Sequence, residues 1–243
     1  MRAIILAAGR GSRMGDHTNT LPKCRTVYKE KELFQWQIDA LKGAGINDIA
    51  VATGYLAETF PRDFSHLKLH FFHNPIWDKS NMVKSLSMAT EWLESSPCIV
   101  TYSDIIYNKK SVEALMASDG DISLLYDHNW RSLWEKRFER PLDDAETFKL
   151  DAETNTILEI GKKTNSYSDI EGQFMGLMKF TPNGWLKIQN YFNTLNDQAL
   201  NKLDSTSLLQ NLIERDVKLQ AVKNPGPWLE VDQPSDLNVD VSL

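Results

Sequence analysis

The chain lacks several features that would assign it to other classes of protein. Its two cysteines, Cys24 and Cys98, have no metal-ligand spacing, which favours free thiols over a disulfide. It has no basic block, and its net charge of −6 argues against nucleic acid or an anionic membrane as the main partner. The apolar run at 3–8 is too short for a signal peptide or a membrane span. These absences favour a cytoplasmic globular protein that binds any anionic substrate through local positive charge.

Apolar patterning along the chain predicts an α/β fold. The 243 residues can bury a sizeable core as one domain, and the hydrophobic content of 42% is ordinary for a globular protein. Apolar runs at 3–8 and 48–53 enclose a segment, 32–44, whose apolar residues recur at helical spacing. A strand, a helix and a strand in that order are typical of a parallel sheet with helices on its faces.

The first strand leads into a glycine-rich segment, Gly9–Gly15, and then into Leu21-Pro22-Lys23. Glycines without Cβ atoms let backbone N–H groups converge on an anion, and Pro22 favours a fixed position for Lys23. A dinucleotide fingerprint fits poorly, because the third glycine comes one place late and no acidic residue ends the next strand. A P-loop is excluded because no Gly-Lys-Ser or Gly-Lys-Thr closes the segment. The sequence therefore predicts a phosphate-binding loop of another kind.

Polar residues elsewhere could face the same crevice. Ser80 is the expected N-cap of the next helix, on which Asn81 and Ser85 lie one turn apart and could contact a base or a ribose, although a solvated helix face is the alternative. Asp104 follows the strand expected at 98–102, and ligands of parallel sheets gather at the carboxyl ends of strands. A carboxylate there could hold Mg²⁺, or it could simply occupy a turn.

Residues 127–144 are rich in aromatic and charged side chains. Trp130, Trp134 and Phe138 recur every four residues, which predicts a short amphipathic helix. These aromatic side chains either pack a peripheral lobe onto the sheet or line a pocket that would suit a cationic group. Strands are expected at 148–151, 157–160 and 173–180, and helices at 185–192 and 205–214.

Two carboxylates lie close together near the end of the chain. Glu230 and Asp232 would point to the same side of a strand, and they would repel each other without a cation or a basic group between them. Asp236 is expected to cap the helix that follows Pro234.

Two motifs together resemble the signature of the nucleotidyltransferases that join a nucleoside triphosphate to a sugar phosphate or a phosphoalcohol. They are Leu6-Ala7-Ala8-Gly9-x-Gly11-x-Arg13-Met14 followed by Leu21-Pro22-Lys23, and Glu230-Val231-Asp232-x-Pro234-x-Asp236-Leu237. The resemblance implies a doubly wound, mostly parallel, Rossmann-like sheet with helices on both faces. It also implies one domain, 1–243, in which 127–180 contributes most of a small acceptor-binding lobe.

The resemblance assigns roles to particular residues. Lys23 and Arg13 would be catalytic, and Asp104 and Asp232 would hold Mg²⁺. The expected nucleotide-binding residues are Leu6, Ala7, Ala8, Gly9, Gly11, Ser12, Arg13, Lys23, Asn81, Ser85 and Ser103. The expected acceptor-binding residues are Trp130, Trp134, Lys162, Glu171, Trp228 and Glu230. An acceptor phosphate would attack the α-phosphorus and release pyrophosphate, with no protein nucleophile.

Within that family the chain looks most like the phosphocholine cytidylyltransferase branch, so CTP and a phosphocholine-like acceptor are expected. A sugar 1-phosphate, or a phosphorylated amino acid or amide such as phosphoglutamine, is the alternative acceptor. A non-catalytic nucleotide sensor on the same fold is a further alternative. Two departures from the family pattern are Arg25, where an apolar residue is usual, and the turn at 29–33. No nucleic acid or membrane partner is expected, and the oligomeric state stays open, with a homodimer as one option.

Overall fold

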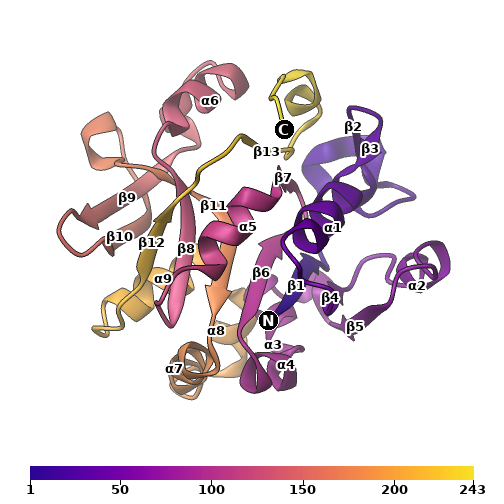
Figure 1. Cartoon of the computed structure of the whole chain (residues 1–243), viewed down its shortest axis with the longest axis horizontal. Coiled ribbons are helices and arrows are strands. Elements are labelled where there is room, and N and C mark those ends of the chain that lie inside the picture. Colours follow the sequence, from indigo (N-terminus) through magenta and orange to yellow (C-terminus); the bar gives the residue numbers. More distant parts are fainter.

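The computed structural model describes the whole chain, residues 1–243, and is built around one nine-stranded sheet (Figure 1). Its strands are β1 (Arg2–Ala7), β4 (Ile49–Thr53), β5 (Leu69–His73), β6 (Cys98–Tyr102), β8 (Ile122–Asp127), β9 (Glu146–Asp151), β10 (Thr156–Lys163), β11 (Gln173–Phe180) and β12 (Gln220–Lys223). They are arranged in the order β5-β4-β1-β6-β11-β8-β12-β10-β9, and only β11 and β10 run opposite to the others. The mostly parallel sheet expected from the sequence is confirmed.

Strand β1 lies inside the parallel part of the sheet and is buried on both faces. Ile5 packs into the core on one face, whereas Ile4 and Leu6 pack into the core on the other. This explains the continuous apolar run, because successive side chains of a strand point to opposite faces. Leu6 is paired with Tyr102 of β6, so the loops that follow these two strands leave the same edge of the sheet.

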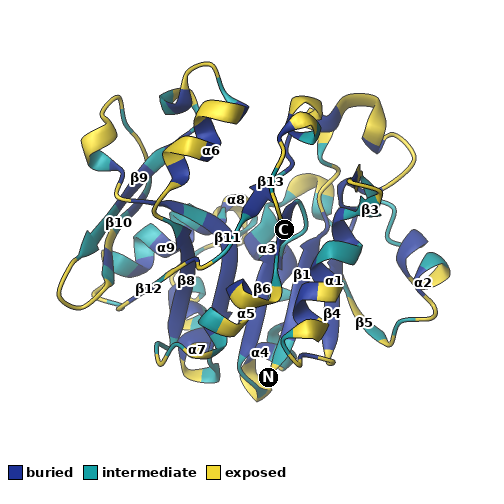
Figure 2. Ribbon diagram, turned by 45° about the horizontal axis from the view of Figure 1, so that its top comes forward, coloured by how far each residue is buried: buried dark blue, intermediate teal, exposed yellow.

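Helices cover both faces of the sheet, and the predicted doubly wound arrangement is confirmed (Figure 2). The helices that pack into the first core are α1 (Leu33–Gly43), α2 (Thr59–Asp63), α5 (Lys109–Met116) and α6 (Trp130–Arg137). Those that pack against the second core are α3 (Met82–Ser87), α4 (Thr90–Ser95), α7 (Pro182–Phe192), α8 (Asp197–Lys202) and α9 (Ser205–Ile213).

The helix expected from Ser80 onward differs from the prediction in two ways. Asn81, not Ser80, is the N-cap of α3, since its side chain accepts a hydrogen bond from the N–H of Met82 at 2.8 Å. The segment is also divided into α3 and α4 around Ala89, whose backbone leaves the helical conformation. Val83 is buried in the core, whereas Met82 faces a cavity.

Two short two-stranded sheets lie outside the central sheet. One pairs β2 (Val27–Tyr28) with β3 (Lys31–Glu32) through a turn in which Lys29 and Glu30 both have positive φ, as in type I′ hairpins. The other pairs β7 (Ile105–Tyr107) with β13 (Trp228–Glu230). The second pairing matters for function, because it joins the segment after Asp104 to the segment before Asp232.

Both cysteines are buried free thiols, as the sequence predicts. Burial raises the pKa of Cys24 and of Cys98 to about 12, so neither is a reactive thiolate near neutral pH. Neither side chain lines the cavities described below.

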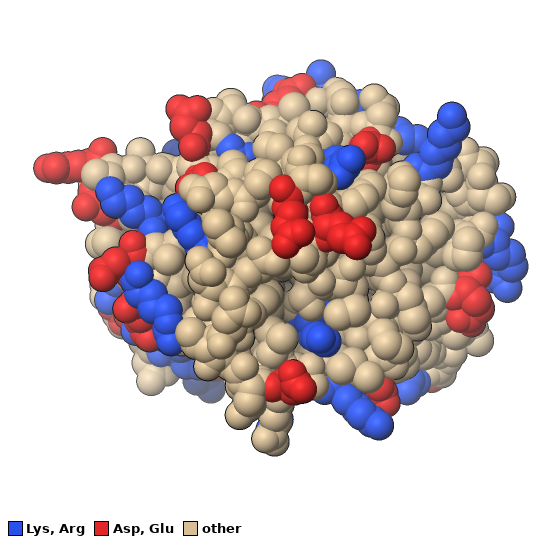
Figure 3. All heavy atoms as spheres, turned by 90° about the horizontal axis from the view of Figure 1, so that it is seen from below, with Lys and Arg blue, Asp and Glu red and all other residues tan.

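No helix is both long enough and apolar enough to cross a membrane. On the lower face of the molecule, acidic and basic side chains are scattered among uncharged ones (Figure 3).

Candidate active site

The loop after β1 forms one wall of a cavity of about 300 Å³ at the carboxyl edge of the parallel strands. The cavity is lined by ten of the eleven residues expected to bind nucleotide, and Ala7 is the exception because it is buried in the core. Four further lining residues were not expected from the sequence: Trp77, Ser80, Met82 and Tyr102. Tyr102 could have been anticipated, since it ends the strand directly before Ser103 and Asp104. Trp77 lies in a connection that carries no distinguishing sequence pattern.

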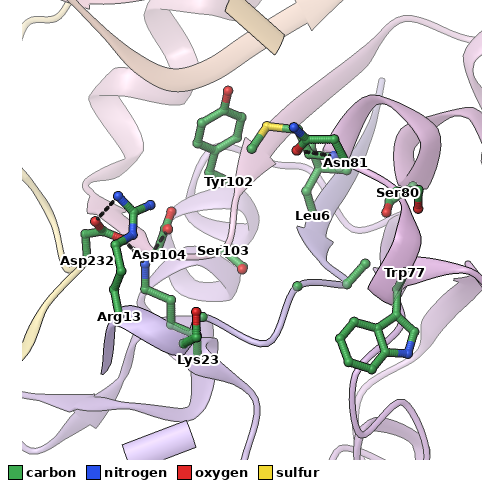
Figure 4. A pocket seen from close by; sticks show the side chains of 16 residues that line it. Leu6, Arg13, Lys23, Trp77, Ser80, Asn81, Tyr102, Ser103, Asp104 and Asp232 are labelled. Carbon is green, nitrogen blue, oxygen red and sulfur yellow. Dashed lines mark hydrogen bonds and ion pairs between the residues drawn. The ribbon is translucent and has the colours of Figure 1, made fainter. Parts of the chain in front are cut away.

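The centre of the site is a cluster of four charged side chains from distant parts of the chain (Figure 4). The ammonium of Lys23 donates to Asp104 Oδ2 at 2.7 Å and to Asp232 Oδ1 at 2.6 Å. Arg13 lies 2.7 Å from Asp232 Oδ2 on the other side. The charged lysine thus lies between Asp104 and Asp232, which would otherwise repel each other.

Local structure fixes each member of this cluster. Lys23 follows Pro22 and begins a short 3₁₀ helix, and its aliphatic stem lies against Gly11. Asp104 sits in the turn between β6 and β7, and its carbonyl accepts a hydrogen bond from the N–H of Val231 at 2.8 Å. Because Val231 directly precedes Asp232, the pairing of β7 with β13 sets the separation of the two carboxylates.

The surroundings of Lys23 shift its pKa, whereas the side chain of Arg13 remains exposed to solvent. Desolvation lowers the pKa of Lys23, but the two neighbouring carboxylates outweigh it, so the net pKa is raised and the group stays charged. The side chain of Arg13 is 73% exposed despite its ion pair, which leaves its guanidinium able to reach a phosphate in the cavity. Lys23 is therefore a fixed charge and Arg13 an adaptable one.

One atom of the cluster has no partner. Asp104 Oδ1 is buried and makes no hydrogen bond, which is costly unless a ligand or ion satisfies it. The chain has no group of three or more His, Cys, Asp or Glu that could hold a metal ion. Mg²⁺ needs only one or two carboxylates when substrate phosphates and water complete its shell. Asp104 and Asp232 thus fit a metal ion that is shared with a phosphorylated substrate.

A buried arginine contacts the segment that carries Asp232. Arg137 of α6 donates to Glu230 at 2.9 Å and to Asp236 at 3.1 Å and 3.3 Å. Asp236 in turn accepts hydrogen bonds from the backbone N–H groups of Asp232 and Gln233, and so caps the helical turn as expected. Burial raises the pKa of Glu230 to about 7 against the opposing effect of Arg137. The sequence carried no signal for Arg137, which looks like one of several surface charges on its helix.

A second cavity, of about 280 Å³, adjoins the first and shares Arg13, Tyr102 and Asp232 with it. Two of the residues expected to bind the acceptor, Trp134 and Glu230, line this cavity. Its remaining lining residues are Asp144, Glu146, Thr147, Phe148, Ile160, Gly161, Lys163, Gln173, Phe174 and Thr206.

The other expected acceptor residues lie elsewhere. Trp130 and Trp228 are buried, with their indole N–H groups bonded to the Ile170 carbonyl and to Asp127. Lys162 is exposed and pairs with Glu159 at 2.8 Å, while its neighbour Lys163 lines the cavity. Adjacent strand residues face opposite sides, so Lys163, and not the expected Lys162, is the lysine that faces the second cavity. Glu171 is exposed and accepts a hydrogen bond from the N–H of Leu150.

Arg25, one of the two departures from the family pattern, is engaged in two ion pairs outside the charged cluster. Its guanidinium bonds to Glu32 and to Asp63, each at 2.7 Å. These pairs join the 3₁₀ helix that carries Lys23 to β3 and to α2, so Arg25 supports the fold beside the site.

The fold and the charged cluster define a nucleotidyltransferase, and comparison with known families agrees. Residues 3–145 match the MobA-like NTP transferase domain, and the chain belongs to this family. The predicted enzyme class is thereby confirmed. Enzymes of this family generally use a divalent metal ion.

Individual relatives and solved structures match this chain to different extents. The chain is 40% identical over 254 residues to a CTP:phosphoglutamine cytidylyltransferase from Campylobacter jejuni, covering 99% of each chain. It is 38% identical over 96 residues to a choline-phosphate cytidylyltransferase from Streptococcus pneumoniae, covering 40% of this chain and 42% of the relative. An inositol-1-phosphate CTP transferase from T. maritima has the same fold, with a TM-score of 0.74 at 19% identity, covering 97% of this chain and 90% of that one.

Proposed function

We propose that this protein transfers a cytidylyl group from CTP to a small phosphorylated acceptor, with phosphoglutamine as the first candidate. The observation that carries the proposal is the similarity to the CTP:phosphoglutamine cytidylyltransferase, which extends over 99% of both chains. Similarity to the choline-phosphate enzyme covers less than half of either chain. The region shared with the phosphoglutamine enzyme includes both cavities, so that enzyme is the better guide to the acceptor.

The proposed reaction needs positioning and charge neutralisation rather than a protein nucleophile. An acceptor phosphate oxygen forms a bond to the α-phosphorus of CTP, and the bond from that phosphorus to the bridging oxygen of pyrophosphate breaks. Arg13 and the N–H groups of the glycine-rich loop would hold the β- and γ-phosphates. Lys23, fixed between its two carboxylates, would stabilise the charge on the α-phosphoryl group as the leaving group departs.

Asp104 and Asp232 would hold Mg²⁺ beside the α-phosphate. The unpartnered Oδ1 of Asp104 supports this assignment. The bound ion would supply Lewis-acid polarisation of a phosphoryl oxygen. The role of the two carboxylates is then to fix the ion, while Lys23 prevents their repulsion when the ion is absent.

Recognition of the base is assigned to the first turn of α3. The side-chain oxygen of Asn81 is engaged in capping the helix, which leaves its amide N–H₂ available to a base carbonyl. Ser85 accepts a hydrogen bond from Asn74, so its own hydroxyl hydrogen is free to donate into the same cavity. Two donors suit the carbonyl and ring nitrogen acceptors on the pairing edge of cytosine.

Phosphocholine is the second candidate acceptor, because Trp134 lines the second cavity and aromatic faces bind quaternary ammonium groups. Against it, three tryptophans of this region are buried and tied by their N–H groups, so they do not form an open cage. A cytoplasmic location and the oligomeric state stay predictions.

The test is pyrophosphate release by the purified protein with Mg²⁺. CTP, UTP, GTP, ATP and dTTP are each combined with phosphoglutamine, phosphocholine, phosphoethanolamine and several sugar 1-phosphates. The highest kcat/KM is expected for CTP with phosphoglutamine. A preference for phosphocholine would select the second candidate, and release with none of the pairs would contradict the proposal.

A further inference from the structure

The second cavity contains two charged groups that face each other across a strand pair without forming an ion pair. Glu146 at the start of β9 and Lys163 at the end of β10 are partners in the antiparallel register. Both line the cavity. Only the backbone of Glu146 is engaged, by Gln173, and its carboxylate joins no hydrogen bond or ion pair. Lys163 Nζ donates only to the backbone carbonyl of Asp144, at 3.2 Å.

The other charged groups of this cavity already have partners. Glu230 is bonded to Arg137, and Asp232 is held by Lys23 and Arg13. Asp144 accepts a hydrogen bond from the indole N–H of Trp134 at 2.9 Å. The carboxylate of Glu146 and the ammonium of Lys163 are therefore the two charged groups that pair with no other side chain, and they lie side by side in a cavity that adjoins the first one.

Glu146 is partly buried, and desolvation raises its pKa. A half-buried carboxylate without a partner is unfavourable in the free protein, and a ligand cation would relieve that cost. Lys163 makes a purely cationic ligand less suitable, because it would lie next to the bound charge. A ligand with both charges matches the pair.

We propose that Glu146 and Lys163 bind the ammonium and the carboxylate, respectively, of an amino-acid-derived phosphate acceptor. This assignment rests on the proposed function and names the part of the acceptor that confers specificity. The phosphate end would lie where the two cavities meet, beside Tyr102 and Asp232, which line both. The aliphatic part would pass over Phe174, and the zwitterionic end would reach the start of β9.

The test compares Glu146→Gln and Lys163→Met with the wild type in steady-state cytidylyl transfer. Three acceptors are used: phosphoglutamine, its N-acetyl derivative and its α-carboxamide derivative. Loss of one charged hydrogen bond predicts a KM for phosphoglutamine about ten- to a hundredfold higher in each variant, with the KM for CTP unchanged. The N-acetyl acceptor has no ammonium group, so Glu146→Gln should not raise its KM further. The α-carboxamide acceptor has no carboxylate, so Lys163→Met should not raise its KM further. That pairing of variant and acceptor would not arise from a general structural defect.

Glu153→Gln and Lys110→Met serve as matched controls, because they remove the same charges at exposed positions outside both cavities. Wild-type KM values for phosphoglutamine in both cavity variants would overturn this inference and leave the proposed function intact. Equal use of phosphocholine and phosphoglutamine by the wild type would overturn it too. Turnover only with sugar 1-phosphates would overturn both the inference and the acceptor class. Melting curves that match the wild type confirm that the variants fold.

Discussion

Gly11 and Lys23 are packed so tightly that a Cβ atom on Gly11 would lie 2.6 Å from Cδ of Lys23. Gly11 also has a φ of +69°, which other residues adopt at a cost of about 1–2 kcal/mol. Gly11→Ala should therefore push the lysine from its place between the carboxylates and lower kcat by at least about tenfold, since removal of one transition-state donor has larger effects still. Steady-state pyrophosphate release measures this.

Gly45→Ala separates backbone strain from displacement of the lysine. Gly45 has a φ of +87° at the end of α1, and a Cβ there would meet nothing within 4 Å. Its substitution should lower the melting temperature but leave kcat unchanged. Equal loss of kcat in the two glycine variants would contradict a specific role for the contact between Gly11 and Lys23.

Removal of the lysine itself tests the catalytic assignment. Lys23→Ala should lower turnover by about a hundredfold or more, the range found when one charge-stabilising donor is lost. The KM for CTP should change less, because Arg13 and the loop amides remain. Turnover close to that of the wild type would remove Lys23 from the mechanism.

Metal dependence tests the two carboxylates. Chelation of divalent ions should abolish pyrophosphate release, and Mg²⁺ should restore it. Asp104→Asn should raise the Mg²⁺ concentration needed for half-maximal activity and lower kcat by about a hundredfold or more. A Mg²⁺ titration of the variant that overlays that of the wild type would exclude Asp104 as a ligand.

The buried Arg137 should be essential for stability. Arg137→Met leaves the fully buried Asp236 without its charged partner, which is expected to lower the free energy of unfolding by about 3–5 kcal/mol. Urea denaturation measures the change. Arg131→Met on the same helix removes an exposed pair with Glu135 and should have little effect. If both variants unfold at similar urea concentrations, the network around Arg137 contributes less than its burial suggests.

The raised pKa of Glu146 predicts a pH dependence. Burial raises it, Lys163 on β10 opposes the shift, and Asp204 and Asp144 add to it. An ionised carboxylate is needed to bind an ammonium group, so the KM for phosphoglutamine should rise as pH falls through this raised pKa. Glu146→Gln should abolish that dependence. A pH profile that is identical in the variant would contradict the assignment.

The same shift has a consequence for stability. Because the pKa of Glu146 is higher in the folded than in the unfolded state, its stabilising contribution is complete below the unfolded pKa and is lost as pH rises through the folded one. Glu146→Gln should therefore be at least as stable as the wild type at pH 8. Thermal melts at several pH values measure this.

Local patterns were sufficient to predict the central part of the sheet, and the resemblance of two motifs to the nucleotidyltransferases implied the reaction class. The run at 3–8, the glycines after it and the segment Leu21-Pro22-Lys23 indicated both the strand and the phosphate-binding loop. These features depend on neighbours along the chain, so a short stretch of sequence contains them. The division between α3 and α4 was missed, because apolar residues continue at helical spacing across Ala89 and only the backbone conformation there ends the first helix.

The sequence by itself predicted an α/β fold with a phosphate-binding loop, because strand patterning and loop glycines are properties of contiguous residues. Its resemblance to the nucleotidyltransferases implied the doubly wound sheet and the reaction class. Only the tertiary structure decided that Lys163 and not Lys162 lines the second cavity, that Arg137 supports the segment of Asp232, and that Glu146 is left without a partner. These features depend on strand register and on contacts between residues that are far apart in sequence. Side-chain pairing across such distances leaves no periodic pattern, so the specificity of the acceptor site could be inferred only once the strands were in place.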